Sequence, residues 1–128
     1  SYESRFRMPQ VRPAELGTLP VTDSLDMNEL PYPLPYEWGN AYYSFSYGPS
    51  KHIVVSAYSS MEPKSSQYEW LVKEFASINR TATPWVLVSI HVPLYNTFDA
   101  HHRDLQVLAA REHLEPLLVK NSVNMVFT

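Results

Sequence analysis

Three of the five histidines lie within twelve residues of one another, as His91, His101 and His102. Neutral imidazole is the commonest metal ligand in proteins, and it can also transfer protons near neutral pH. The chain has no cysteine, so a metal bound here would be held by histidine, carboxylate, asparagine or tyrosine rather than by thiolate. A lone histidine is more often an ordinary surface or core residue, and we expect that of His52 and His113. The cluster therefore predicts metal binding or acid–base catalysis, with a structural role as the alternative.

The position of His91 favours a functional site. It directly follows Trp85–Ile90, an apolar run that predicts a strand covered on both faces. In α/β proteins, ligands bind just beyond the carboxyl ends of the strands. The pair His101-His102 follows one loop later, and the segment as a whole favours a functional site over a structural role.

Further strands are predicted on both sides of this segment. Two segments rich in β-forming residues, 42–47 and 52–58, flank the turn signal Gly48-Pro49 and predict a hairpin. The final segment, 123–127, predicts a buried strand.

Two helices separate these strands. One is predicted over 65–79, with Ser65 or Ser66 as its N-cap, and another over 103–113, with Pro116 opening a further helical turn. The order of hairpin, helix, strand, helix and strand predicts an α/β fold, a sheet covered by helices. The residues expected to face inward are Tyr68, Leu71, Val72 and Phe75 in the first helix, and Leu105, Leu108 and Ala109 in the second.

The composition bounds the remaining possibilities. The chain has 128 residues, of which 45% are hydrophobic and 18% charged, so it can bury a core. A net charge of −3 without a basic stripe argues against nucleic acid as a partner. No apolar run is long enough to cross a membrane. We expect residues 1–40, which hold six prolines, to be mostly an irregular loop, and residues 41–128 to form the sheet and helices.

The two ends of the chain suggest that it is a piece of a longer protein. It begins at Ser1 without a methionine or an apolar signal core, and it ends inside the predicted final strand. We therefore interpret residues 1–128 as an internal fragment.

The histidine segment resembles a known family. Val88-Ser89-Ile90-His91-Val92-Pro93-Leu94-Tyr95-Asn96 is similar to the motif V-x-x-H-x-P-W-Y-N of the purple acid phosphatases, which belong to the calcineurin-like metallophosphoesterases. Other segments resemble that family in the same order, and the proline-rich stretch of about 10–38 is the part that does not. The matching segments are 4–9, 43–45 with 52–54, 66–71, 79–85, and 115–116 with 123–127.

The resemblance implies that residues 1–128 are part of a metallophosphoesterase catalytic domain, a four-layer αββα sandwich, in an enzyme that hydrolyses phosphate monoesters. It implies a dinuclear centre of Fe(III) with Zn, Mn or Fe(II), which binds the phosphoryl group and activates a bound hydroxide as nucleophile. His91 would ligate the divalent metal, and His101 and His102 would bind phosphate oxygens or protonate the leaving group. The family's other metal ligands have no counterpart in this chain, so we expect the chain alone to be inactive.

Several alternatives stay open. A related metallophosphoesterase could act on diesters or nucleotides, and a homologue without metals could serve as a binding module. An aromatic-rich carbohydrate-binding domain ranks last, because it does not explain an apolar strand that ends at His91. Asn79-Arg80-Thr81 is an N-glycosylation sequon, and with the resemblance it favours a secreted, vacuolar or lysosomal location.

Overall fold

The computed structural model describes residues 41–97 and 103–128. The expected irregular loop over 1–40 and the predicted site residues His101 and His102 lie outside these ranges. Within them, no helix is both long enough and apolar enough to cross a membrane.

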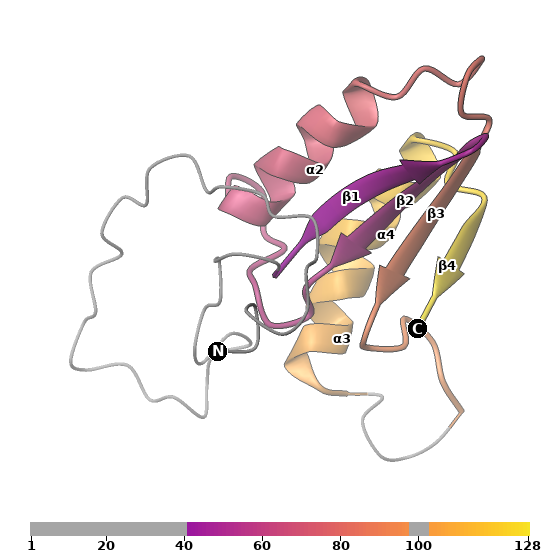
Figure 1. Ribbon diagram of the computed structural model, residues 1–128. Helices are drawn as coiled ribbons and strands as arrows, with labels where there is room; N and C mark the ends of the chain where they lie inside the picture. The colour runs from indigo at the N-terminus through magenta and orange to yellow at the C-terminus, as the bar shows by residue number, and fades with distance from the viewer. Residues whose placement is uncertain (1–40, 98–102) are drawn as a thin grey trace, which may run out of the picture.

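A four-stranded sheet forms the centre of the described structure (Figure 1). Its strands are adjacent in chain order: β1 (Tyr43–Tyr47), β2 (Ser50–Val55), β3 (Trp85–Ile90) and β4 (Met125–Phe127). β1 and β2 form an antiparallel hairpin, whereas β2, β3 and β4 are mutually parallel. The mixed α/β class predicted from the sequence is confirmed.

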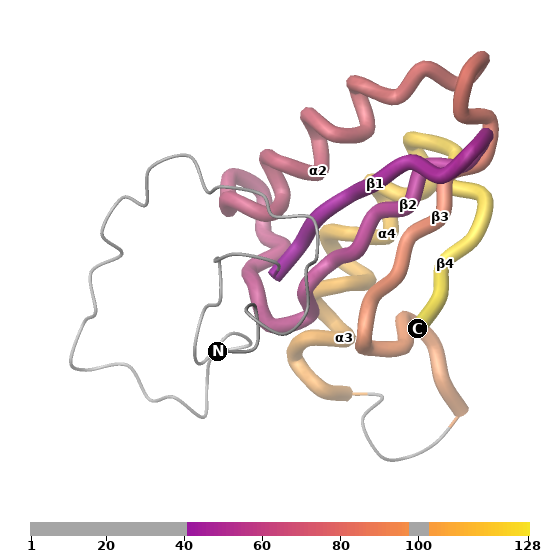
Figure 2. Tube along the Cα trace, viewed as in Figure 1, coloured from indigo at the N-terminus to yellow at the C-terminus, as the bar shows by residue number. Residues whose placement is uncertain are grey.

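Two helical segments connect the parallel strands. α2 (Ser66–Ala76) joins β2 to β3, and a continuous segment made of α3 (Leu105–Ala109), the π-helix η1 (Ala110–Leu114) and α4 (Glu115–Lys120) joins β3 to β4. Both crossovers step in the same direction along the sheet, and such crossovers are right-handed. Both segments therefore lie on the same face of the sheet. The trace of the chain in Figure 2 shows them running alongside the strands.

The core lies between this face and the helices. Successive side chains of a strand point to opposite faces, and Ile53, Val55 and Val88 point toward the helices, where they are almost completely buried. The helices contribute residues of equal burial. Leu71 and Phe75 come from α2, and Ala110, Leu114, Leu117 and Leu118 come from the second helical segment.

The opposite face of the sheet carries a row of largely apolar residues. Phe45, His52, Leu87 and Met125 are paired in register across all four strands. The rings of Phe45 and His52 stack, with centroids 4.8 Å apart and planes 2° from parallel. No described helix covers this face. The large hydrophobic residues exposed on it are Phe45, Tyr47, Trp85, Met125 and Phe127.

The predicted strands are confirmed in number and order, with corrections to their burial and ends. Trp85–Ile90 has the predicted bounds, but β3 is buried on the helical face and only half-buried on the other, so the expected cover on both faces is wrong for the described residues. β4 starts at Met125 rather than at 123, and Met125 and Phe127 are exposed rather than buried. β2 ends at Val55 because the Ser56 hydroxyl accepts hydrogen bonds from the N–H groups of residues 58 and 59, which turns the chain.

The first helix begins where predicted, but some of its buried residues differ from the predicted ones. Ser65 is the N-cap, and its hydroxyl accepts a hydrogen bond from the Tyr68 N–H at 3.3 Å. The helix ends at Ala76 rather than at 79. Leu71 and Phe75 are buried as predicted, but Val72 is exposed and Gln67 occupies a fully buried position instead.

The second helical segment differs more from its prediction. Leu105 and Leu108 are exposed, and the buried residues of the segment are Val107, Ala110, Leu114, Leu117 and Leu118. The spacing of these buried residues is that of one helix face, and this face continues through the wider turn of η1. The predicted face is therefore wrong, whereas the helical period holds. Pro116 lies just after this wide turn, inside α4, and the segment continues through it without a break. A proline cannot donate the backbone hydrogen bond that an α-helical turn requires at that position.

Candidate functional site

His91 lies at the carboxyl edge of the parallel strands, as the sequence predicts. Its side chain is exposed directly after β3. It borders an open depression of about 310 Å³, which the ends of the three parallel strands line together. Figure 1 shows the end of β3 and the carboxyl terminus close together at this edge. The lining residues are Val54, Val55, Ser89, Ile90, His91, Phe127 and Thr128.

A second loop reaches this edge from the end of β2. The ring of Tyr58 lies 6.3 Å from the His91 ring, centroid to centroid, at an interplanar angle of 32°. The loop is fixed by Gln67, whose side-chain oxygen accepts from the Ser56 N–H at 2.8 Å. The amide nitrogen of Gln67 donates to the carbonyl groups of Ser56 at 3.0 Å and Ser59 at 3.2 Å. A fully buried amide thus satisfies the backbone of the loop beside His91.

The loop after His91 is held by side chains from the second helical segment. The Tyr95 hydroxyl donates a hydrogen bond to the Glu115 carboxylate at 2.7 Å. The Arg111 guanidinium lies over the Tyr95 ring, 4.7 Å from its centroid, and its Nε donates to the Leu94 carbonyl. The hydrogen bond to Glu115 is the main cause that raises the pKa of Tyr95 above its ordinary value of 10.0.

The described residues offer one candidate metal ligand at this edge. Within 41–97 and 103–128, no three histidine, cysteine or acidic side chains come together as a metal-binding group. An exposed imidazole beside an open depression fits the role of a single ligand, and further ligands would have to come from other parts of the protein. His101 and His102 lie outside the described residues, so their predicted convergence with His91 stays a prediction.

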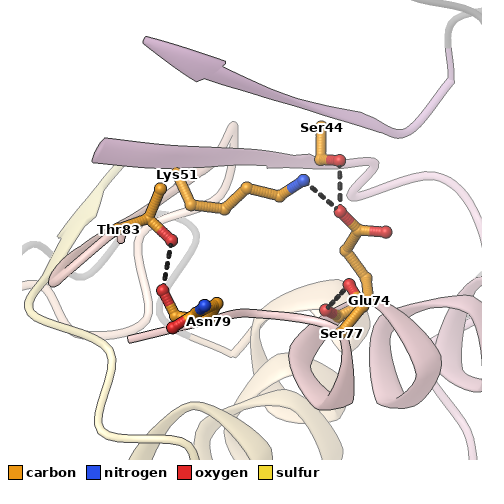
Figure 3. Close-up of polar contacts among 6 residues, drawn as sticks. All are labelled: Ser44, Lys51, Glu74, Ser77, Asn79 and Thr83. Atoms are coloured by element: carbon orange, nitrogen blue, oxygen red, sulfur yellow. Dashed lines mark hydrogen bonds and ion pairs between the residues drawn. The ribbon is translucent and has the colours of Figure 1, made fainter. Parts of the chain in front are cut away.

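A separate polar cluster lies at the other end of the strands. Figure 3 shows Ser44 of β1 and Lys51 of β2 pointing toward Glu74 of α2. The Ser44 hydroxyl donates to a Glu74 carboxylate oxygen at 2.5 Å, and the Lys51 ammonium lies 2.5 Å from the same oxygen. Partial burial would raise the pKa of Glu74. The hydrogen bonds from Lys51 and Ser44 and the charge of Lys51 outweigh that effect and lower the pKa below its ordinary 4.5.

Asn79 lies in an exposed turn at this same end. Its side-chain oxygen accepts from the Thr81 N–H at 3.0 Å, which forms an Asx-turn across the sequon. Its carbonyl accepts from the Thr83 N–H at 2.8 Å and the Thr83 hydroxyl at 3.1 Å (Figure 3). The sequon is therefore accessible in a defined backbone conformation.

Sequence reasoning identified His91 and missed the residues that surround it. Gln67 lies within segment 66–71, which resembles the family, but the hydrophobic pattern did not predict a polar residue in the core. Arg111 and Glu115 are four residues apart, a spacing that places both on one side of a helix. That spacing was the sequence feature from which a shared contact of Arg111 and Glu115 could have been predicted.

Comparison with known proteins gives a consistent result. The chain is 41% identical over 86 residues to purple acid phosphatase 13 of Arabidopsis thaliana, covering 67% of this chain and 15% of that protein. It is 36% identical over 101 residues to purple acid phosphatase 1 of Ipomoea batatas, covering 76% and 21%. It is 32% identical over 114 residues to a purple acid phosphatase of Glycine max, covering 88% and 24%. No family model matches the chain.

The structural comparison points the same way. A purple acid phosphatase isolated from yellow lupin (Lupinus luteus) seeds superposes with a TM-score of 0.58 at 25% identity, over 66% of this chain and 15% of the lupin chain. The present chain spans about a fifth of the length of the curated relatives it matches.

Proposed function

The chain belongs to the purple acid phosphatase family, and on that premise we propose that it forms part of the catalytic domain of a metal-dependent acid phosphatase. The substrates of this proposed enzyme are phosphate monoesters. The observation that carries the proposal is the exposed imidazole of His91 at the carboxyl edge of a parallel sheet, beside an open depression.

His91 is the proposed ligand of the divalent metal in a dinuclear centre of Fe(III) with Zn, Mn or Fe(II). Such a centre supplies positive charge for the phosphoryl oxygens and a nucleophile at low pH. The protein's own contribution is to hold the imidazole at a rigid strand end, where the hydrogen bonds of β3 fix its backbone. Because one ligand cannot hold two metals, the residues that complete the centre belong to the remainder of the proposed enzyme.

His101 and His102 are the proposed substrate-facing residues. They follow His91 by ten and eleven residues, close enough in the chain to return to the same edge. An imidazolium there can bind a phosphate oxygen or donate a proton to the leaving alkoxide.

Replacement of His91 tests the assignment. In the full-length protein, His91→Ala is expected to lower metal affinity by about 10–100-fold and to remove most of the turnover of a phosphate monoester. Metal content measured by mass spectrometry and the steady-state rate are the readouts. The 128-residue chain alone is expected to show no metal-dependent turnover.

His52→Gln is the matched control. It also removes an imidazole, but His52 lies in β2 against Phe45, away from the carboxyl edge, so metal content and rate are expected to stay close to those of the unmodified protein. Unchanged metal content and rate in His91→Ala would remove His91 from the site and favour a non-catalytic homologue.

N-glycosylation of Asn79 is a further part of the proposal, together with a secreted, vacuolar or lysosomal location. It is supported by the exposed Asx-turn at the sequon. Expression in a glycosylating host should give a protein that loses mass with an N-glycosidase, and Asn79→Gln should reduce that loss by one glycan. An identical loss of mass in Asn79→Gln would exclude this position.

A further inference from the structure

Arg111, Tyr95 and Glu115 join the loop after His91 to the second helical segment. Arg111 contacts this loop twice, through the backbone carbonyl of Leu94 and through the face of the Tyr95 ring. Glu115 contacts it once, by accepting from the Tyr95 hydroxyl. The loop has no regular secondary structure of its own between residues 91 and 97. Val92 and Leu94 pack against the core. The polar contacts of Arg111 and Glu115 hold the carboxyl-terminal part of the loop, where no backbone ladder continues from β3.

The π-helix directs these side chains to the loop. Ala110 and Leu114 of η1 are buried in the core, which fixes the orientation of the helix. Arg111 directly follows Ala110, and Glu115 directly follows Leu114. The side chains of Arg111 and Glu115 therefore point away from the core on the same side of the helix. Single π-turns inside α-helices occur frequently at functional sites.

The Tyr95 ring is not held by burial. It is 66% exposed, so the hydrophobic effect contributes little to its position. A cation–π contact and a hydrogen bond to a carboxylate, both charge-assisted, hold it instead. An exposed aromatic ring fixed in this way favours a role in shaping the loop over a role in the core.

We propose that Arg111 is a positioning residue for His91: together with Tyr95 and Glu115, it fixes the segment 91–96 and so the direction of the imidazole. The inference rests on the proposed function, because it takes His91 as a metal ligand. The strand fixes His91 only on its amino-terminal side, and the loop held by Arg111 fixes the other side. A displacement of about 1 Å at such a position can lower a catalytic rate by about 100-fold.

The test uses the full-length metal-loaded enzyme and three variants. Arg111→Met is expected to lower metal affinity and kcat by about 10-fold each, with a smaller change in KM, because substrate-binding groups remain. Arg111→Lys keeps the charge and should recover part of that loss. Tyr95→Phe removes only an exposed hydroxyl and should lower kcat by about 3-fold. Amide hydrogen exchange gives a readout besides activity, and residues 92–96 should exchange faster in Arg111→Met while α2 stays unchanged.

Arg80→Met is the matched control. Like Arg111, Arg80 donates to a backbone carbonyl, that of Ser122 at 2.8 Å, although Arg80 is exposed and Arg111 is half-buried. It lies at the opposite end of the strands, so its replacement should leave metal affinity, kcat and exchange of residues 92–96 unchanged.

The outcomes separate this inference from the proposed function. If His91→Ala abolishes metal binding while Arg111→Met changes neither kinetics nor exchange of residues 92–96, the positioning role is wrong and the proposed function stands. If Arg111→Met speeds exchange throughout the sheet while Arg111→Lys and Tyr95→Phe have normal kinetics, Arg111 is only structural. If His91→Ala has no effect on metal content, the proposed role of His91 fails, and that of Arg111 fails with it.

Discussion

Glu74 shows how one carboxylate joins two layers of the structure. It comes from α2, and its partners Ser44 and Lys51 come from the two strands of the hairpin. The Lys51 and Glu74 side chains are only 17% and 18% exposed, so the ion pair is screened less than one on an open surface. Loss of either charge leaves the other partly desolvated and unpaired.

Glu74→Gln is expected to destabilise the chain by about 1–2 kcal/mol near neutral pH. The effect should depend on pH, because the pKa of Glu74 is lower in the folded state than its ordinary 4.5. A depressed pKa gives stability that is fully present above the unfolded-state value and is lost as the pH falls through the folded-state value. The difference between the two proteins should therefore shrink as the pH falls below about 4.5. Urea unfolding at a series of pH values measures it.

Glu62→Gln is the control for that series, since Glu62 is an exposed carboxylate in the loop between β2 and α2. Its stability should follow that of the unmodified chain at every pH. A difference for Glu74→Gln that stayed constant down to pH 3 would show that the charge of Glu74 does not contribute.

At the scale of elements, Gln67 connects α2 to the loop that carries Tyr58. Its amide is fully buried and makes hydrogen bonds to the backbone of Ser56 and Ser59. Those backbone groups have left the sheet, and the side chain of a helix supplies their partners instead.

Gln67→Ala is expected to destabilise the chain by about 2–4 kcal/mol, because it leaves buried N–H and C=O groups without partners and opens a cavity. Thermal or urea unfolding measures the loss. Gln106→Ala, which replaces a half-buried glutamine of α3, should stay within about 0.5 kcal/mol. Equal losses in both variants would contradict a special role for Gln67.

Helices and strands could be predicted from the sequence where a single interaction, such as hydrophobic burial or one capping hydrogen bond, determines them. The apolar run Trp85–Ile90 gave its strand with the right bounds, because a strand buried against helices needs little besides hydrophobicity. Ser65 was a correct cap candidate for a similar reason, since a hydroxyl accepts one particular N–H. The inward face predicted for the second helical segment was wrong, because Val107 and Ala110 are buried whereas Leu105 and Leu108, on another side of the helix, are exposed. A buried Gln67 in place of Val72 could not be read from hydrophobicity at all.

The candidate site was predictable in position and not in its surroundings. His91 follows a strand, and the end of a strand is a geometric location that local sequence defines. Arg111, Tyr95 and Glu115 meet only after two distant segments have packed together, and no local pattern specifies that meeting. The dependence on packing explains why the resemblance indicated His91 as a candidate ligand but not the residues that hold its loop.

At the scale of the whole molecule, the sheet has two unlike faces. The helices cover Ile53 and Val88, whereas Phe45 and Leu87 belong to the row on the face that no described helix covers. In the four-layer arrangement that the resemblance implies, this second face would pack against another sheet.

Neighbouring residues of one strand therefore have different partners. A substitution at Ile53 acts on the cohesion of this unit, because it changes how the helices hold the sheet. A substitution at Val54, one residue further along, would instead change the face that the proposed second sheet covers. The pleat of a single strand thus separates internal stability on one side from the proposed contact with a second sheet on the other.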